Sequence, residues 1–186
     1  MNVKQPLVPA ISRSRLEFLF DGVFAIAMTI LVLELKVPEL VDRHSIQELA
    51  RALANHTPTF VSYLLSFGML GLLWYRHNLQ YHHFRVITRS MLVLHFVQLA
   101  AAAFFPFCAA LLGRYPTNGL AQLVYMSCIL VYAWASLANW VIAKRSGSLG
   151  SETGAEDFLR SRNKLFRGCL GLSTVFVIYL IRVLAN

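Results

Sequence analysis

Charged side chains are scarce in this chain of 186 residues. Only 14% of the residues are Asp, Glu, Lys or Arg, whereas 57% are hydrophobic. Soluble domains carry about 25% charged residues, so the composition excludes an ordinary soluble protein and is typical of an integral membrane protein. The length leaves no room for a separate soluble domain, and we treat residues 1–186 as a single transmembrane domain.

Cysteine is also rare, and the sequence motifs of catalysis are missing. The three cysteines, Cys108, Cys128 and Cys169, all stand in apolar stretches. An odd count argues against a disulfide framework, and their spacing is not that of a metal site. The sequence contains no Gly-x-Ser-x-Gly, no His-Glu-x-x-His and no phosphate-binding loop. We therefore expect no enzyme, no metal site and no bound cofactor.

What the sequence does contain is a set of long apolar runs. Each approaches the ~20 residues that a helix needs to cross a bilayer, and they lie at residues 15–35, 59–75, 91–112, 120–143 and 165–184. The predicted fold is therefore an all-α, polytopic bundle of five membrane-spanning helices. Pro38 should end the first helix, and Pro106 should kink the third or end its regular part.

Two connections between the spans have compositions of their own. Ser45 and Glu48 match a capping box, and the residues that follow place Ile46, Leu49 and Leu53 on one face. This pattern predicts a short amphipathic helix at the membrane surface. Residues 144–154 are rich in Gly and Ser, which predicts a flexible loop.

The distribution of basic residues predicts the orientation. The formal net charge of +8 would point to nucleic acid in a soluble protein, but in a membrane protein Lys and Arg mark the cytoplasmic loops. With the five spans above, 12 of the 17 Lys and Arg residues fall on the side of the N-terminus. The first run has no cleavage site after it, so it is interpreted as a retained span. We predict a multi-pass protein of the cell membrane with a cytoplasmic N-terminus, an external C-terminus and no nucleic-acid partner.

The first apolar run carries ionisable residues near its start. Arg15 and Asp21 are six residues apart, nearly two helical turns, so both can lie on similar sides of a helix. Ionisable groups at membrane depth usually face protein or water, and polar residues near the cytoplasmic end of the second span, His77 and Asn78, could be their partners. A pair that only fixes helix packing is the alternative. The histidines in this region have no carboxylate beside them in the sequence, so a metal site is not expected.

The same run carries an aliphatic stripe. Ile26, Ile30 and Leu33 share one face of a helix, and Thr29 borders it. Such a stripe is consistent with ordinary packing. Several copies arranged around a symmetry axis would instead form stacked apolar rings, which gate ions by dewetting and by forcing the loss of hydration water.

Residues 21–35, Asp-Gly-Val-Phe-Ala-Ile-Ala-Met-Thr-Ile-Leu-Val-Leu-Glu-Leu, strongly resemble the first helix of the transmembrane protein 175 potassium channel family in its short prokaryotic form. That family begins this helix with Arg-x-x-x-Phe-Ser-Asp, and Arg15 and Asp21 hold the same spacing. Leu19 and Phe20 stand where the family has Phe and Ser, so a hydroxyl is missing and its hydrogen bond must be replaced or lost. The second span and the segment around Pro106 also look like the family, so the resemblance covers most of the chain.

The resemblance implies a homotetramer with the first helix lining a central pore, and six spans, one more than the residues indicate. The family lacks the Thr-Val-Gly-Tyr-Gly filter of ordinary potassium channels, and this sequence lacks it too. The family's narrowest point corresponds to Ile26, and further pore-facing positions correspond to Thr29 or Ile30 and to Leu33. Glu34 would then stand at the outer pore mouth, where it could collect cations; a charge that simply faces interfacial water is the alternative.

We therefore predict a passive, potassium-selective channel whose partners are potassium ions, membrane lipid and other copies of the chain. Two other classes stay open. One is a proton-coupled secondary transporter that uses Asp21 or Glu34 as its carrier carboxylate. The other is a membrane scaffold that conducts nothing. Saturable uptake driven by a counter-ion would distinguish the transporter from a channel.

Overall fold

The structure is a computed structural model in which long helices dominate, and it describes residues 13–150 and 155–184. The elements are α1 (Arg13–Ile30), its 3₁₀ continuation η1 (Leu31–Glu34), α2 (Ile46–Asn55), α3 (Thr57–His82), α4 (Arg89–Arg114), α5 (Gly119–Arg145) and α6 (Ala155–Leu184). Most of the polar N-terminal segment, residues 151–154 of the predicted flexible loop and the C-terminal residues 185–186 lie outside the described residues.

Five helices in the described residues are long and apolar enough to cross a membrane, which confirms the predicted all-α polytopic fold. Helical form is what a membrane requires, because a helix satisfies its backbone N–H and C=O groups internally where no water is available. The sixth span that the resemblance implies is not found within residues 13–150 and 155–184.

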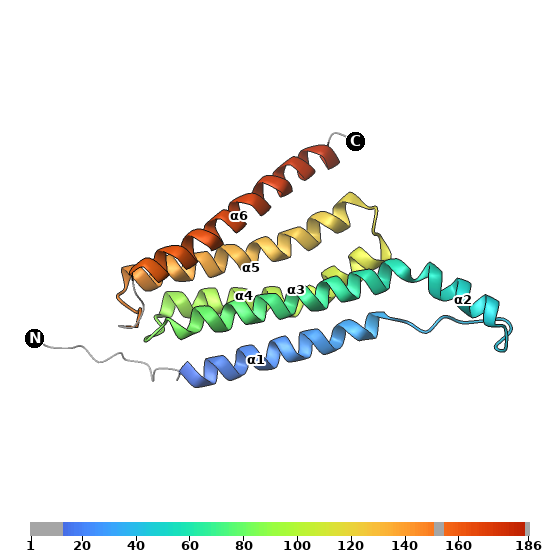
Figure 1. Cartoon of the computed structure of the whole chain (residues 1–186), viewed down its shortest axis with the longest axis horizontal. Coiled ribbons are helices and arrows are strands. Elements are labelled where there is room, and N and C mark those ends of the chain that lie inside the picture. Colours follow the sequence, from blue (N-terminus) through green and yellow to red (C-terminus); the bar gives the residue numbers. More distant parts are fainter. Residues whose placement is uncertain (1–12, 151–154, 185–186) are drawn as a thin grey trace, which may run out of the picture.

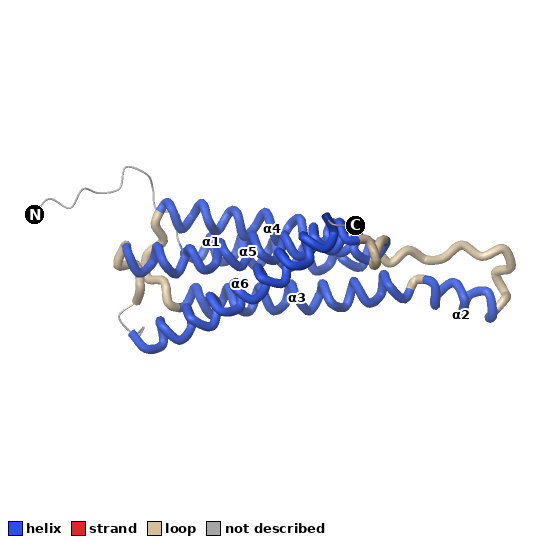
Figure 2. The backbone as a smooth tube through the Cα atoms, turned by 90° about the horizontal axis from the view of Figure 1, so that it is seen from above, coloured by secondary structure: helices blue, strands red, loops and turns tan. Residues whose placement is uncertain are grey.

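The helices are stacked in layers. Figure 1 shows α1 on one side of the bundle, α3 and α4 in the next layer, then α5, and α6 on the side opposite α1. Helix α4 packs against α1, α3 and α5, and α6 packs against α5. Both views show α2 projecting past one end of the bundle, which we call the α2 end (Figure 2). The other end holds the starts of α1, α4 and α6 together with residues 83–88 and 146–150, and we call it the basic end.

The membrane helices are longer than the sequence patterns predicted. Helix α3 ends at His82 rather than near residue 75, so His77 and His82 are helical and do not belong to a loop. Helix α4 continues through Pro106 to Arg114, so the proline does not end it. In the turn before the proline, the Cys128 thiol of α5 donates to the Ala101 carbonyl over 3.2 Å. Side chains of adjacent helices commonly serve backbone groups around a membrane proline.

Close approach between α3 and α4 depends on Gly113 of α4. A Cβ at Gly68 of α3 would meet nothing within 4 Å, and one at Gly71 would make an ordinary contact of 3.8 Å with the Met28 Cε of α1. A Cβ at Gly113 on α4 would instead lie 3.2 Å from the Thr59 Cα and 3.3 Å from the Ser62 Cβ. The Ser62 hydroxyl also donates to the Ala109 carbonyl over 2.7 Å, which joins the two helices.

The predicted amphipathic helix is present as α2. The Ser45 hydroxyl accepts from the Glu48 N–H, which is the first half of the capping box. The Glu48 carboxylate does not return to Ser45 but accepts from the N–H groups of Val41 and Asp42, over 2.9 and 3.1 Å. The cap therefore fixes both the start of α2 and the turn before it.

At the basic end two connections are joined. The Arg85 N–H donates to the Ser148 carbonyl over 2.8 Å, and the Gly150 N–H donates to the His83 carbonyl over 2.9 Å. The beginning of the predicted flexible loop is therefore held against residues 83–88. Gly147 has a φ of 65°, a conformation that favours glycine, and it allows this turn.

Candidate pore-lining helix

Helix α1 and its continuation η1 have one buried face and one open face. The buried side chains recur every three or four residues and pack against the core formed with α3, α4 and α5; they are Leu16, Phe20, Phe24, Ala27 and Leu31. This spacing keeps one stripe of a helix pointed at its neighbours. The large apolar residues of the stripe hold α1 on the bundle.

The residues predicted to line a pore lie on the opposite, open face. Ile26 is 60% exposed, Ile30 40% and Leu33 70%, whereas Phe24 on the other face is 1% exposed. Gly22 and Ala25 are exposed beside them, so the open face is apolar with small residues near its middle. Thr29 is exposed as well, and its hydroxyl donates to the Ile26 carbonyl of its own helix over 2.8 Å. The Thr29 oxygen is therefore a polar atom beside the apolar side chains of this face.

The hydrogen bonds of Asp21 differ from the prediction. Asp21 Oδ1 accepts from Trp74 Nε1 of α3 over 2.8 Å, so neither His77 nor Asn78 is the hydrogen-bond partner that was expected. The Asn78 amide instead donates to the Trp74 carbonyl over 3.1 Å. A polar link between α1 and α3 is therefore present, but its donor is the indole N–H of Trp74. Arg15 lies exposed on α1.

His77 is covered by an aromatic ring. It is 3% exposed, and the Phe20 ring lies against it with ring centroids 3.4 Å apart and an angle of 1° between the planes. Neither ring nitrogen of His77 has a hydrogen-bond partner among the described residues. The sequence pointed to this contact, because Phe20 stands where the family motif has a serine hydroxyl. The hydroxyl is not replaced by another donor; an apolar ring takes its place.

A buried polar layer that the sequence reading missed lies behind His77. His95 and Gln98 of α4 and Asn139 of α5 are 1% exposed or less, and Gln98 Oε1 lies 3.2 Å from both His95 Nδ1 and Asn139 Nδ2. His95 is therefore a hydrogen-bonded residue of the core. No periodicity in the sequence shows that residues of α4 and α5 so far apart meet.

An arginine just before the predicted one ties α1 to the basic end. Arg13 forms an ion pair with Glu17 over 2.9 Å, and its guanidinium donates to the Phe84 carbonyl over 3.0 Å. The pair is part of the helix surface, so its own contribution to stability is small. The bond to Phe84 fixes the start of α1 against residues 83–88.

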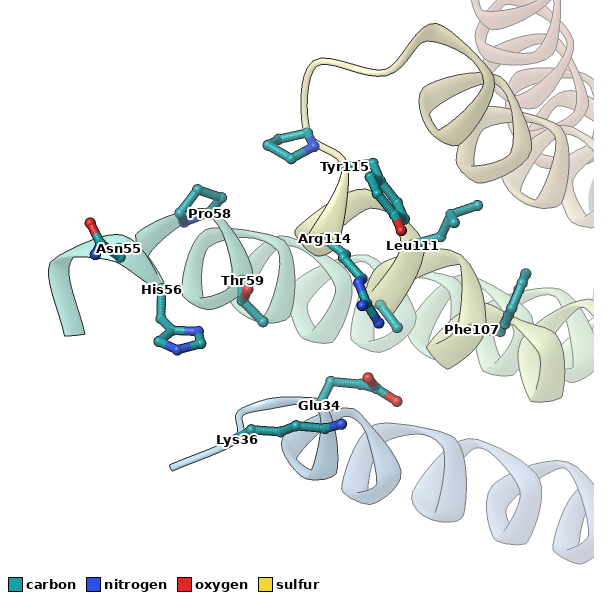
Figure 3. A pocket seen from close by; sticks show the side chains of 13 residues that line it. Glu34, Lys36, Asn55, His56, Pro58, Thr59, Phe107, Leu111, Arg114 and Tyr115 are labelled. Carbon is teal, nitrogen blue, oxygen red and sulfur yellow. The ribbon is translucent and has the colours of Figure 1, made fainter. Parts of the chain in front are cut away.

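At the α2 end Glu34 lines a cavity of about 610 Å³ between η1, α3 and α4. Figure 3 shows Lys36 beside Glu34 and Arg114 reaching toward both from α4, with His56 and Thr59 on the other side. The carboxylate therefore shares its surroundings with two cationic side chains. These neighbours oppose the collection of cations, so the predicted role of Glu34 at a pore mouth gains no support from its position.

The described residues hold no group of three or more His, Cys, Asp and Glu side chains that could bind a metal ion. The three cysteines are buried and free, as predicted. The feature that stands out in the described residues is the open apolar face of α1.

Comparisons with known proteins match the chain to a single family. The family model described as endosomal/lysosomal potassium channel TMEM175 matches residues 15–106. A potassium channel of Chamaesiphon minutus is 30% identical over 167 residues, covering 87% of this chain and 80% of that protein. A potassium channel of Streptomyces collinus is 31% identical over 139 residues, covering 73% of this chain and 66% of that one.

An animal relative and a solved structure complete the comparison. The human endosomal/lysosomal proton channel TMEM175 is 32% identical over 143 residues, but the chain spans only 28% of its length. The crystal structure of a lysosomal potassium-selective channel TMEM175 homolog from Chamaesiphon minutus has a TM-score of 0.77 at 27% identity, covering 93% of this chain and 89% of that chain. The chain spans less than two thirds of both the Streptomyces and the human relatives.

Proposed function

This chain belongs to the TMEM175 family of ion channels, and we propose that it forms a potassium-permeable channel in the cell membrane. Two bacterial relatives are named potassium channels, and the similar crystal structure is of a potassium-selective homolog. The observation that carries the proposal is the open face of α1, which is apolar, long enough to cross a bilayer and left uncovered by the rest of the chain.

A single copy has no pore of its own, so the proposal requires assembly. Helix α1 lies on one side of the bundle (Figure 1) and its open face carries Gly22 and Ala25, whose small side chains let neighbouring helices come close. We propose a homotetramer in which four copies of α1 surround the axis. The other helices of each copy then face lipid, and the N-terminus lies in the cytoplasm as the basic residues predict.

In this assembly the exposed side chains of α1 would form stacked rings. Ile26 would be the narrowest ring, with Thr29 or Ile30 and then Leu33 further along the path. An isoleucine ring offers no oxygen to replace hydration water, so each ion crosses hydrated or sheds water at an energetic penalty. Potassium holds its water less tightly than sodium, so a narrow apolar ring favours potassium without a carbonyl filter.

Current recording from purified protein in planar bilayers tests the proposed function. Under a KCl gradient we expect discrete current steps that reverse toward the equilibrium potential for potassium. Uptake that saturates and requires a proton gradient would indicate the coupled transporter, and an absence of flux from well-assembled protein would indicate a scaffold. Because the animal relatives are named proton channels, a second recording with equal KCl and a pH gradient measures whether protons also carry current.

A further inference from the structure

Two adjoining cavities form one groove between α3, α5 and α6, on the side of the bundle away from α1. The cavity nearer the basic end has a volume of about 220 Å³ and is lined mainly by polar and basic side chains, including Arg76, His83, Ser161 and Lys164. The cavity nearer the membrane centre has a volume of about 150 Å³ and is lined mainly by apolar side chains, including Met69, Leu72 and Leu172. Arg76, Ser136 and Leu165 line both cavities, so the two are continuous.

The lining residues change from polar to apolar in the same direction on each helix. Along α3 and the residue that follows it they run from His83 back to Met69, and on α6 from Ser161 forward to Leu172. At 1.5 Å per helical residue the groove extends for about 20 Å. One half of the hydrocarbon core is about 15 Å thick. A groove with a polar end and an apolar end of this length has the dimensions of a phospholipid headgroup and part of its acyl chain.

The polar end carries two basic side chains, Arg76 and Lys164. Among the described side chains, no carboxylate lies within 4 Å of Arg76 or Lys164. Arg76 stands six residues before the end of α3, about 9 Å along the helix axis. Near the boundary between headgroups and hydrocarbon, an anionic partner stabilises a basic side chain.

The floor of the groove is already ordered. Gln80 and Ser136 are 3% and 8% exposed and are bonded to each other: the Gln80 amide donates to the Ser136 carbonyl over 2.7 Å, and the Ser136 hydroxyl donates to Gln80 Oε1 over 2.8 Å. Trp140 lines the same cavity. Tryptophan is common at the level of the lipid headgroups. The shape of the polar end is therefore set before any ligand enters.

We propose that this groove binds an anionic phospholipid, with the phosphate between Arg76 and Lys164 and one acyl chain along the apolar half. Basic pockets between membrane helices are the sites where anionic headgroups bind. Because α6 lies opposite α1 (Figure 1), assembly around α1 leaves the groove facing the membrane. The proposal does not depend on ion conduction and is tested on purified protein without a current measurement.

Native mass spectrometry of delipidated, full-length protein tests the headgroup. Titration with phosphatidylglycerol should give saturable binding that phosphatidylcholine does not reproduce. The double variant Arg76→Gln, Lys164→Gln should bind phosphatidylglycerol about 25-fold more weakly, since each basic residue near an anionic surface accounts for roughly a fivefold change. The charge-conserving variant Arg76→Lys, Lys164→Arg should keep most of the binding, which separates loss of charge from misfolding.

The double variant Arg85→Gln, Arg89→Gln is the control for non-specific electrostatic attraction of the lipid. It removes the same charge from exposed residues at the same end of the bundle, outside the groove. An equal loss of binding in this control would overturn the proposal, as would equal binding of phosphatidylcholine. Displacement of the lipid by millimolar inorganic phosphate would assign the site to a soluble anion and would also overturn it.

The apolar half has a matched pair of tests on α6. A Cβ at Gly168 or at Gly171 meets nothing within 4 Å, but only Gly168 lines the apolar cavity. Gly168→Leu should fill the space that the acyl chain needs and weaken binding of long-chain phosphatidylglycerol several-fold, whereas Gly171→Leu should leave it unchanged. Equal effects of the two variants would contradict the placement of the chain.

Discussion

The Phe20 ring of α1 lies flat on the buried His77 ring of α3, with ring centroids 3.4 Å apart and planes 1° apart. Phe20 also stacks on Phe24, over 5.3 Å. Both Phe20 and Phe24 belong to the face that holds α1 on the bundle. The position of α1 therefore rests on aromatic packing at a place where the family motif has a serine.

Removing the Phe20 ring should destabilise the protein. Phe20→Ala deletes a fully buried ring, and we expect a loss of about 3 kcal/mol in the free energy of unfolding. Phe20→Ser should lose about 1 kcal/mol less, because a hydroxyl beside His77 gives one of its unpaired nitrogens a hydrogen-bond partner. Reversible unfolding in mixed detergent measures both values. Phe96→Ala, at a ring that is 51% exposed on α4, is the control; an equal loss there would refute the assigned role of Phe20.

The Asp21–Trp74 hydrogen bond should appear as an interaction between two substitutions. Asp21→Ala and Trp74→Phe each remove one partner of the 2.8 Å bond, so the double variant should lose less stability than the sum of the single variants. We expect a coupling of about 1 kcal/mol. Tyr75→Phe is the control, since it also removes a polar hydrogen from α3. Its effect on the free energy of unfolding should add to that of Asp21→Ala. Additive losses in the Asp21–Trp74 cycle would show that the bond contributes nothing.

Two glycines should respond differently to a methyl group. Gly113→Ala places a Cβ 3.2 Å from the backbone of Thr59, so α3 and α4 must move apart. We expect a loss of about 1–3 kcal/mol, in the range of overpacked cores. Gly68→Ala meets open space and should not destabilise the protein. Thermal unfolding followed by size-exclusion chromatography compares them, and equal melting temperatures would contradict the close approach at Gly113.

The predicted orientation can be tested with single cysteines at the two ends of the bundle. Arg85 lies at the basic end and Thr117 lies between α4 and α5 at the α2 end, and both are exposed. In a background without the native cysteines, an impermeant maleimide should label Thr117→Cys on intact cells and Arg85→Cys only after permeabilisation. The reverse pattern would place the N-terminus outside the cell.

The sequence predicted the number and type of the helices because membrane-spanning helices need long apolar runs, and such runs are visible without any knowledge of the fold. Capping at Ser45 was also predictable, since the bond to Glu48 N–H is local. The C-terminal end of α3 was not predictable in this way. Residues 76–82 are mostly polar, but they continue the helix because His77, Gln80 and Tyr81 are buried in the bundle.

The site was predictable as a stripe but not as a set of contacts. Spacing alone places Ile26, Ile30 and Leu33 on one face, and the structure leaves that face open. The partners of Asp21 and His77 depend on how α1 and α3 lie against each other, which no periodicity encodes. The mean polarity of a helix likewise does not reveal that Arg76 and Lys164 border the same groove.

The central claim is that Ile26 forms the selective constriction of a potassium pore. Reversal potentials of reconstituted wild-type protein and Ile26→Asn, measured with potassium on one side and sodium on the other, test it most directly. We predict a clear potassium preference for the wild type, and for Ile26→Asn a larger current with a reversal potential shifted toward zero, because added amides contact both ions. Leu64→Asn, at a residue of α3 that is 66% exposed, should keep the wild-type value. An unchanged reversal potential in correctly assembled Ile26→Asn would remove Ile26 from the pore.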